Sequence, residues 1–326
     1  VAWWAGMSYR RSTHFVTAPD GTRVAVHHHD AGLPDAERDR VLAGRPPVLL
    51  TNGIGTSENF WRHIVTNLEQ DHRVVHWDYR GHGGSDESRD GDYRVKVHVD
   101  DLERVTEETI ARGNGRPPHH IAFSMGVRIL LELYRRRPEL VPSMTLIAGT
   151  PGVPGAADPR WGSRLALSAT RQMLRAGTPW VPVVAPAVKA VIASRFADPL
   201  ARAVGALRAR APREDIAEFL DALYRMSPQA YWHTLRGLTE GHAWDVVSTV
   251  SVPVLIIAAR DDVLVPLSEV QRLHRALPQA EWLQVDDAGH AGLLEAGTEI
   301  SEAVRCFLLV HGLEAPASVQ PPVIRG

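Results

Sequence analysis

The residues with the clearest chemical potential lie in the segment HHIAFSMG, His119–Gly126, which has Ser124 at its centre. The segment predicts a short apolar strand that runs into A-x-S-x-G, followed by a helix over Val127–Arg137 that Pro138 ends. A serine on such a tight strand-to-helix turn is held off the surrounding backbone, so an incoming carbonyl carbon can reach its hydroxyl. Ser124 is therefore the candidate nucleophile, although a five-residue pattern of this kind also arises by chance.

Two further side chains follow in an order that suits catalysis by a serine. The apolar run Pro253–Ala259 is typical of a buried strand and leads into two adjacent carboxylates, Asp261 and Asp262. The next predicted strand, Trp282–Val285, leads into a loop that contains His290. A serine hydroxyl needs a base within hydrogen-bond reach, and a histidine whose ring is oriented by an aspartate can supply one. The chain order is thus serine, aspartate, histidine, each on a loop after a predicted strand.

This arrangement resembles the α/β-hydrolase superfamily, and the resemblance covers nearly the whole chain. Besides A-x-S-x-G, the matching segments are Asn52-Gly53-Ile54-Gly55, DYRGHGGSD at Asp78–Asp86, D-x-x-x-P at Asp262–Pro266, and Gly289-His290. Two residues depart from the commoner family pattern: Ala122 replaces the first glycine of the serine turn, and Asn52 replaces a histidine. Neither change removes a backbone donor, so neither argues against activity.

The resemblance implies a role for each site residue. Ser124 is the nucleophile, His290 the base and Asp262 the acid, because counting back four residues from Pro266 selects Asp262 over Asp261. The backbone N–H groups of Ile54 and Met125 form the oxyanion hole, where each donor is typically worth about 3 kcal/mol of barrier. Water then releases the acyl group as an acid, and neither a metal ion nor an organic cofactor is required.

The implied fold class is α/β: an α/β-hydrolase fold with a mostly parallel eight-stranded sheet flanked by helices and an inserted helical lid. We expect residues 8–150 and 245–314 to form the core, residues 151–244 the lid, and residues 1–7 and 315–326 flexible termini. An opening hairpin is predicted around Pro19-Asp20-Gly21. The remaining predicted core elements are strands at Val48–Thr51, Arg73–Trp77, His119–Phe123 and Met144–Ala148, and helices near Ser57, at Val97–Ala111 and around Ile300–Leu308.

The lid window shows no strand pattern and contains alanine- and arginine-rich helical segments. One apolar stripe joins Trp161, Leu165, Ala169 and Met173, another joins Ile216, Phe219, Leu220 and Leu223, and the prolines of TPWVPVVAP predict a turn or linker between them. Residues 151–242 carry twelve positive and seven negative side chains. We expect the arginines on solvated helix faces; the alternative is that some line the entrance and attract anionic substrates.

Composition narrows the remaining possibilities. At 326 residues and 44% apolar, the chain can bury a large core, and its net charge of -2 gives no reason to expect nucleic acid as a partner. The single cysteine, Cys306, excludes an internal disulfide, and this cysteine usage indicates a cytoplasmic protein. We expect Cys306 to be a small core residue of the last helix. The opening VAWWAG lacks the features of a signal peptide, and no stretch approaches the ~20 apolar residues of a membrane span.

Other polar residues have simpler explanations than catalysis. The triplet His27–His29 could suggest a metal site, but successive strand residues point to opposite faces, so only two of the three can converge. We therefore expect a solvated strand end and no metal. Asp78 and Arg80 are expected to form a loop-fixing pair, and His82 is expected to be a structural loop residue.

These observations favour a serine hydrolase that acts on a small-molecule acyl substrate, with carboxylesterase chemistry first. Enol-lactonase, thioesterase and carbon–carbon bond hydrolase activities of the same fold are the alternatives. A ligand-binding relative with little or no turnover is an alternative of another class, which fold analogy does not exclude. The sequence leaves the natural substrate and the oligomeric state undetermined.

Overall fold

The computed structural model describes residues 10–30, 42, 44–153, 161–203, 207–208 and 210–312. The termini that the sequence predicts to be flexible, 1–7 and 315–326, lie outside these residues. So do the first apolar residues, VAWWAG.

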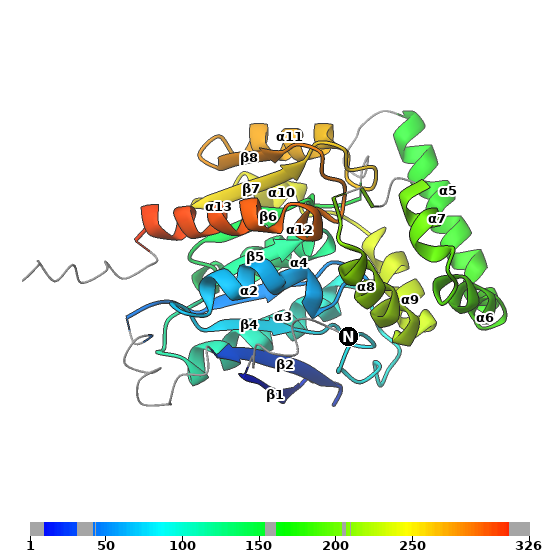
Figure 1. The fold of residues 1–326 in the computed structure, drawn as a ribbon, viewed down its shortest axis with the longest axis horizontal. Coiled ribbons are helices and arrows are strands. Elements are labelled where there is room, and N and C mark those ends of the chain that lie inside the picture. Colours follow the sequence, from blue (N-terminus) through cyan, green and yellow to red (C-terminus); the bar gives the residue numbers. More distant parts are fainter. Residues whose placement is uncertain are drawn as a thin grey trace, which may run out of the picture.

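An eight-stranded sheet forms the centre of the molecule, in the order β1-β2-β4-β3-β5-β6-β7-β8 (Figure 1). β2 pairs antiparallel with both of its neighbours and the remaining pairs are parallel, which confirms the predicted mostly parallel sheet. The predicted strands are present with ends shifted by a few residues. Their bounds are β1 Arg10–Thr17, β2 Arg23–Asp30, β3 Val48–Thr51, β4 Val74–Trp77, β5 His119–Phe123, β6 Met144–Ile147, β7 Val254–Ala259 and β8 Glu281–Val285.

Two apolar layers form because successive strand residues point to opposite faces of the sheet. Leu49 of β3 faces one layer, whereas its neighbours Val48 and Leu50 face the other. The first layer is covered by α3 (Val95–Arg112), α4 (Met125–Arg136), α10 (Trp244–Val247) and α11 (Leu267–Ala276). The second layer is covered by η2 (Glu58–Trp61), α2 (Arg62–Leu68), α12 (Gly292–Glu295) and α13 (Gly297–Val310), while η3 (Pro138–Leu140) follows α4. Cys306 lies on the exposed side of α13 and is not the core residue expected from the sequence.

A helical insertion lies between β6 and β7, as predicted. It contains α5 (Trp161–Gly177), η4 (Thr178–Trp180), α6 (Val181–Ile192), α7 (Ala197–Ala203), α8 (Arg213–Arg225) and α9 (Pro228–Leu238). In Figure 1, α8 and α9 lie between the sheet and the outer helices α5 to α7. No single described helix is long and apolar enough to cross a membrane, although one bent pair, Ser168–Ile192 with Ala197–Ala203, passes by length and composition.

The prediction of a turn or linker at TPWVPVVAP is wrong, because η4 and the first half of α6 occupy this segment. Pro179 and Pro182 lie in the first turn of their helices, where a backbone N–H would have no helical partner. Pro186 lies inside α6 and removes one internal hydrogen bond, which the surrounding helix tolerates.

The two predicted apolar stripes have different outcomes. Ile216 of α8 is buried, and Phe219 and Leu220 pack against the second core layer. Along α5, by contrast, Ala169 and Met173 are exposed, so this part of the predicted stripe does not pack inward. The side chains of Trp161 and Leu165 lie outside the described part of the structure.

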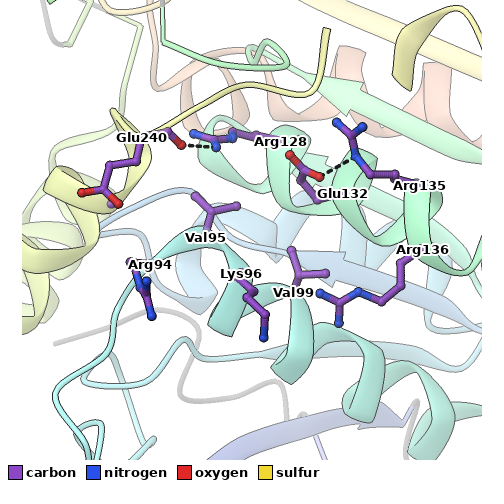
Figure 2. A pocket seen from close by; sticks show the side chains of 10 residues that line it. Arg94, Val95, Lys96, Val99, Arg128, Glu132, Arg135, Arg136 and Glu240 are labelled. Atoms are coloured by element: carbon purple, nitrogen blue, oxygen red, sulfur yellow. Dashed lines mark hydrogen bonds and ion pairs between the residues drawn. The ribbon is translucent and has the colours of Figure 1, made fainter. Parts of the chain in front are cut away.

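Arg128 of α4 joins the core to the end of the insertion (Figure 2). Its guanidinium donates to the carbonyl of Leu238, at 2.6 Å, and to that of Glu240. Arg171 of α5 donates to the next carbonyl, that of Thr239, at 2.7 Å. The last carbonyls of a helix have no helical donors and carry partial negative charge, so two guanidinium groups stabilise the end of α9. Because α4 begins directly after Ser124, this contact links the serine turn to the insertion.

We expect Arg128→Ala to destabilise the protein and loosen the insertion, because the Leu238 and Glu240 carbonyls lose a buried donor. The expected loss is about 1–3 kcal/mol in the free energy of unfolding, measured in urea, with faster proteolytic cleavage within residues 161–240. Arg135→Ala is the matched control, since Arg135 lies on the same helix but pairs with Asp245 and Glu132 at the surface. Equal stability and cleavage for the two variants would contradict the role assigned to Arg128.

The two histidines that begin β5 lead to a prediction about how the free energy of unfolding depends on pH. His119 and His120 are fully buried, and burial lowers the pKa of His119 and brings the pKa of His120 to about 4. The pKa of an unfolded histidine is about 6.5, so between these values the unfolded chain binds protons that the folded chain does not. Above pH ~6.5 both histidines are neutral in the folded and the unfolded chain, and the free energy of unfolding does not depend on them. Below that pH the free energy of unfolding falls by about 1.4 kcal/mol per pH unit for each histidine, until the pKa of the folded state is reached.

The measurement is urea unfolding of the wild type and of His120→Leu at several pH values on either side of the histidine range. We expect the free energy of unfolding of the variant to depend less steeply on pH, by about one proton. An unchanged slope in a folded variant would contradict the depressed pKa of His120.

Candidate active site

Ser124 lies at the turn between β5 and α4 in a backbone conformation that is rare for serine, with φ 53° and ψ -116°. The turn is held by close packing. A Cβ on Gly126 would stand 2.7 Å from the carbonyl oxygen of Thr51, and one on Gly149 would stand 2.4 Å from that of Ser124. A positive φ at a non-glycine residue costs about 1–3 kcal/mol and persists where the surroundings fix it. The structure thus supplies the tight strand-to-helix turn that the sequence motif predicts.

The structure brings Ser124, His290 and Asp262 into one hydrogen-bonded chain. Ser124 Oγ lies 2.9 Å from His290 Nε2, and His290 Nδ1 lies 2.8 Å from Asp262 Oδ2. The Asp262 side chain is almost fully buried and that of His290 is 15% exposed. With the proton of His290 on Nδ1, this ring nitrogen donates to the carboxylate and Nε2 can accept the proton of the Ser124 hydroxyl.

The carboxylate of Asp262 is fixed by its own loop. Its Oδ1 accepts hydrogen bonds from the backbone N–H groups of Leu264 and Val265, both at 2.8 Å. Asp261, the alternative acid, has a half-exposed side chain with one carboxylate oxygen 3.8 Å from the guanidinium of Arg208. The geometry therefore distinguishes the two carboxylates: of the two, only Asp262 contacts His290.

Glu295 is a positioning residue that the sequence reasoning missed. Its buried carboxylate accepts the backbone N–H of Gly289, next to His290, and that of Arg208 in the insertion, both at 2.6 Å. It therefore connects the loop of the candidate base to the insertion. Its place on a four-residue helix, α12, soon after Gly289-His290, gives no local sequence signal of this contact.

The loop that contains Ile54 lies against the serine turn. A Cβ on Gly53 would stand 2.9 Å from the ring of Phe123 and 3.1 Å from Cβ of Ser124. The side chain of Asn52 points away from Ser124 into the structure: its amide donates to the carbonyl of Trp77, and its oxygen accepts the indole N–H of Trp61. Asn52 thus anchors the loop. Ile54 comes directly after Gly53 in this loop, and Met125 comes directly after Ser124 in the serine turn, so both residues lie in the segments that meet beside Ser124.

Helices α8 and α9 cover this loop. A Cβ on Gly55 would meet the ring of Tyr231 at 3.0 Å and the side chain of Leu223 at 3.5 Å. Phe219 of α8 contacts Phe60 edge to face, and Phe60 in turn contacts Phe123, directly before Ser124. The insertion therefore places apolar and aromatic side chains next to the serine turn.

Several described arginines of the insertion contact backbone carbonyls or carboxylates. Arg202 and Arg225 pair with Asp198 and Asp221 on their own helices. Arg208 and Arg210 donate to the carbonyls of Asp261 and Asp286, in the loops that precede the acid and the base. These contacts lie within helices α7 and α8 or tie the insertion to the loops of the candidate acid and base.

Of the two expectations about the segment after β4, one is wrong and one agrees with the structure. Asp78 and Arg80 do not pair with each other: Arg80 pairs with Asp101 and Asp20, while Asp78 accepts from the backbone N–H of Gly84 and contacts His27. Each still fixes the loop, through a different set of neighbours. His82 is buried and contacts the carbonyl of Arg80, in agreement with a structural role.

The expectation of a solvated end for β2 is also wrong. His27 and His29 are buried beneath Arg11, Glu58 and the loop after β4, because β2 lies inside the sheet between β1 and β4. Burial lowers the pKa of His29 to about 3. As the alternation predicts, only these two of the three imidazoles share a face, whereas His28 stacks on His14.

The chain belongs to the α/β-hydrolase fold family, whose sequence profile matches residues 46–297. It is 28% identical to the protein named "Putative carbamate hydrolase RutD" of Pseudomonas syringae over 270 residues, which covers 82% of this chain and 95% of that protein. It is also 28% identical over 313 residues to "Probable oxidoreductase EphD" of Mycobacterium bovis, covering 91% of this chain and 50% of that protein.

Solved structures show the same fold. An esterase from Exiguobacterium antarcticum superposes with a TM-score of 0.70 at 17% identity, covering 91% of this chain and all of that one. An enol-lactonase from Burkholderia xenovorans superposes with a TM-score of 0.67 at 18% identity, with the same coverage. At these identities the similarity establishes the fold, and the chemistry has to be argued from the site.

Proposed function

We propose that the protein is a serine hydrolase that cleaves a small-molecule ester through an acyl-enzyme intermediate. The single observation that carries the proposal is the continuous chain from Ser124 Oγ to His290 and Asp262, with hydrogen-bond distances of 2.9 and 2.8 Å. Membership of the α/β-hydrolase fold family and the similarity to proteins named as hydrolases support it.

In the proposed mechanism, Ser124 Oγ attacks the acyl carbon while His290 Nε2 takes its proton. The imidazolium that forms is stabilised by Asp262, whose carboxylate is fixed by two backbone donors and needs no rearrangement. His290 returns the proton to the leaving alcohol, and water then attacks the acyl-enzyme by the reverse route. The backbone N–H groups of Ile54 and Met125 are the proposed donors to the oxyanion.

The residues that cover the serine turn support a neutral substrate. Leu223 and Tyr231 of the insertion lie over Gly55, and Phe219 continues the aromatic contacts from Phe60. Burial raises the pKa of the Tyr231 hydroxyl, which keeps this group uncharged. An apolar cover of this kind favours a neutral acyl or alcohol group over a charged one. A panel of chromogenic esters, lactones and thioesters tests this preference, and the absence of turnover on every substrate would favour the ligand-binding alternative.

We expect Ser124→Ala to leave the fold intact and to lower kcat for ester hydrolysis by about 10⁴-fold or more. The measurement is hydrolysis of a chromogenic acyl ester, together with mass-spectrometric mapping of a serine-directed phosphonate. Ser143→Ala is a control that removes the hydroxyl of another buried serine, which contacts His119 at the opposite end of β5 from the turn. Retained turnover in purified Ser124→Ala, or a phosphonate adduct on another serine, would overturn the proposal.

The neighbouring carboxylates provide a matched pair of variants. We expect Asp262→Asn to lower kcat by about 10³–10⁴-fold, because the amide no longer stabilises the imidazolium, whereas Asp261→Asn changes it by less than about threefold. Circular dichroism and the unfolding midpoint serve as checks on the fold of both variants. The opposite ranking of the two rates would show that the acid has been assigned to the wrong residue.

A further inference from the structure

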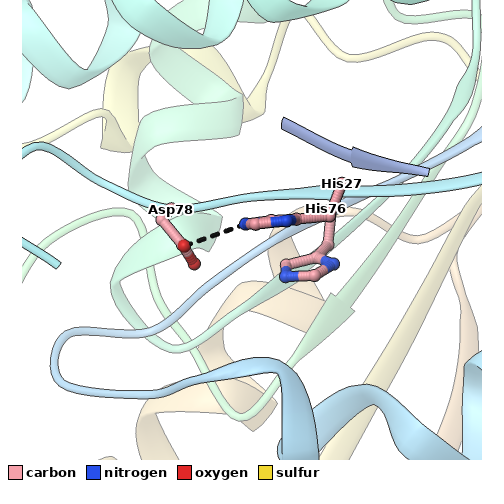
Figure 3. Close-up of side chains that lie close together, drawn as sticks. All are labelled: His27, His76 and Asp78. Atoms are coloured by element: carbon pink, nitrogen blue, oxygen red, sulfur yellow. Dashed lines mark hydrogen bonds and ion pairs between the residues drawn. The ribbon is translucent and has the colours of Figure 1, made fainter. Parts of the chain in front are cut away.

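Three imidazoles gather where β2 pairs with β4. The register of the two strands sets His27 opposite His76, and the two rings stack with centroids 4.3 Å apart. His29 follows on the same face of β2, with its ring centroid 5.0 Å from that of His76. Asp78, directly after β4, places Oδ2 3.0 Å from His27 Nε2 (Figure 3). The rings of His27 and His76 are almost fully buried, at 2% and 1% exposure.

The hydrogen bonds on Nδ1 of the two facing rings allow the tautomer in which Nε2 of each ring carries a lone pair. His27 Nδ1 lies 2.8 Å from Thr13 Oγ1, which can accept its proton and leave the lone pair of Nε2 on the side of Asp78. His76 Nδ1 lies 2.8 Å from His29 Nε2, which can accept in the same way and leave Nε2 of His76 free to bind. Such partners on the second ring nitrogen are the usual support of imidazoles that bind metal ions.

We propose that His27, His76 and Asp78 form a binding site for a divalent transition-metal ion of the Zn²⁺ class. One ligand atom from each of these residues lies within 4.8 Å of the others. Because the two rings are stacked and an imidazole binds a metal ion in its own plane, binding requires one ring to turn about its side-chain bonds until both lone pairs meet at the ion. Two imidazoles and one carboxylate, with a position left for water, are a donor set that Zn²⁺ uses at about 2.0–2.1 Å. Mg²⁺ and Ca²⁺ prefer sites made of oxygen atoms.

The surroundings of the site favour a cation. The three residues line a cavity of about 430 Å³, which gives an ion a path from solvent. Besides Asp78, the cavity walls carry four carboxylates against two guanidinium groups, an excess of negative charge that raises the local concentration of cations. These groups are Glu58, Glu87, Glu218 and Asp221, and Arg11 and Arg225. His29 and Glu58, whose nearest ring nitrogen and carboxylate oxygen are 3.9 Å apart, extend the support of His76 outward.

The ion would join β2 to the loop after β4. That loop contacts the insertion, since a Cβ on Gly81 would overlap the side chain of Ala230 in α9 at 2.3 Å. Binding is therefore expected to stabilise the folded chain in proportion to the logarithm of the free ion concentration. None of the three ligands belongs to the chain of Ser124, His290 and Asp262, so this site is independent of the proposed hydrolase function.

The test uses the full chain without a histidine tag, treated with EDTA and then titrated with Zn²⁺ in a calorimeter. We expect one equivalent to bind with a Kd in the micromolar range or below and to raise Tm. X-ray absorption at the zinc edge should give two imidazole nitrogens at about 2.0–2.1 Å. This measurement on the wild type does not depend on how well any variant folds. Failure to bind Zn²⁺, or a ligand set without two imidazoles, would overturn the proposal.

Variants locate the ion. His27→Gln and His76→Gln should weaken Zn²⁺ binding by at least about 100-fold, and Thr13→Val, which removes only the support of His27, by about 10–100-fold. His28→Gln is the matched control, because this neighbour on β2 faces the opposite side and stacks on His14. His290→Gln should also bind normally, which distinguishes this site from binding at the candidate triad. Wild-type affinity in folded His27→Gln and His76→Gln would contradict the assignment.

Discussion

The structure depends above all on one tight turn, at which Ser124 has a positive φ. The turn is possible because β3, β5 and β6 approach without side chains in the way: a Cβ at Gly53, Gly126 or Gly149 would stand within 3 Å of a neighbouring atom. In the described chain the non-glycine residues with positive φ are Ser124, Ala148 and Asp287, which follow β5, β6 and β8. The strained backbone positions therefore lie beyond the carboxyl ends of these strands, which is where the candidate triad assembles.

The insertion is held to this edge by polar contacts at both ends of its inner helices. Asp215, near the start of α8, pairs with Arg62 of α2, and its carbonyl accepts the amide of Asn59. Arg128 holds the carbonyls after α9, and Glu295 joins Arg208 to the loop of His290. These contacts tie the apolar cover to the same elements that carry the proposed nucleophile and base.

The interior beneath β2 is unusually polar for a sheet of this kind. Side chains with ring nitrogens occupy facing positions on β2 and β4, where most inner strands of parallel sheets carry aliphatic residues. Buried polar groups are stable only when hydrogen-bonded, and here Thr13 is the partner of His27 and His29 is the partner of His76. A region built in this way keeps nitrogen lone pairs at fixed positions, which is the physical basis of the proposed metal site.

The sequence by itself indicated the fold class through its family motifs, and it indicated the succession of strands along the chain because apolar runs ended by polar loops are set by local patterning. The order of the strands within the sheet came from the structure. The sequence also indicated Ser124, Asp262 and His290, since the motif spacing places each after a strand. Tertiary structure decided what depends on neighbours distant in the chain. The prolines of α6 proved compatible with a helix, Arg80 found Asp101 instead of Asp78, and Glu295 reached Gly289. The alternation of β2 indicated that only two imidazoles of His27–His29 share a face, but only strand pairing buried them against His76 and brought Asp78 alongside.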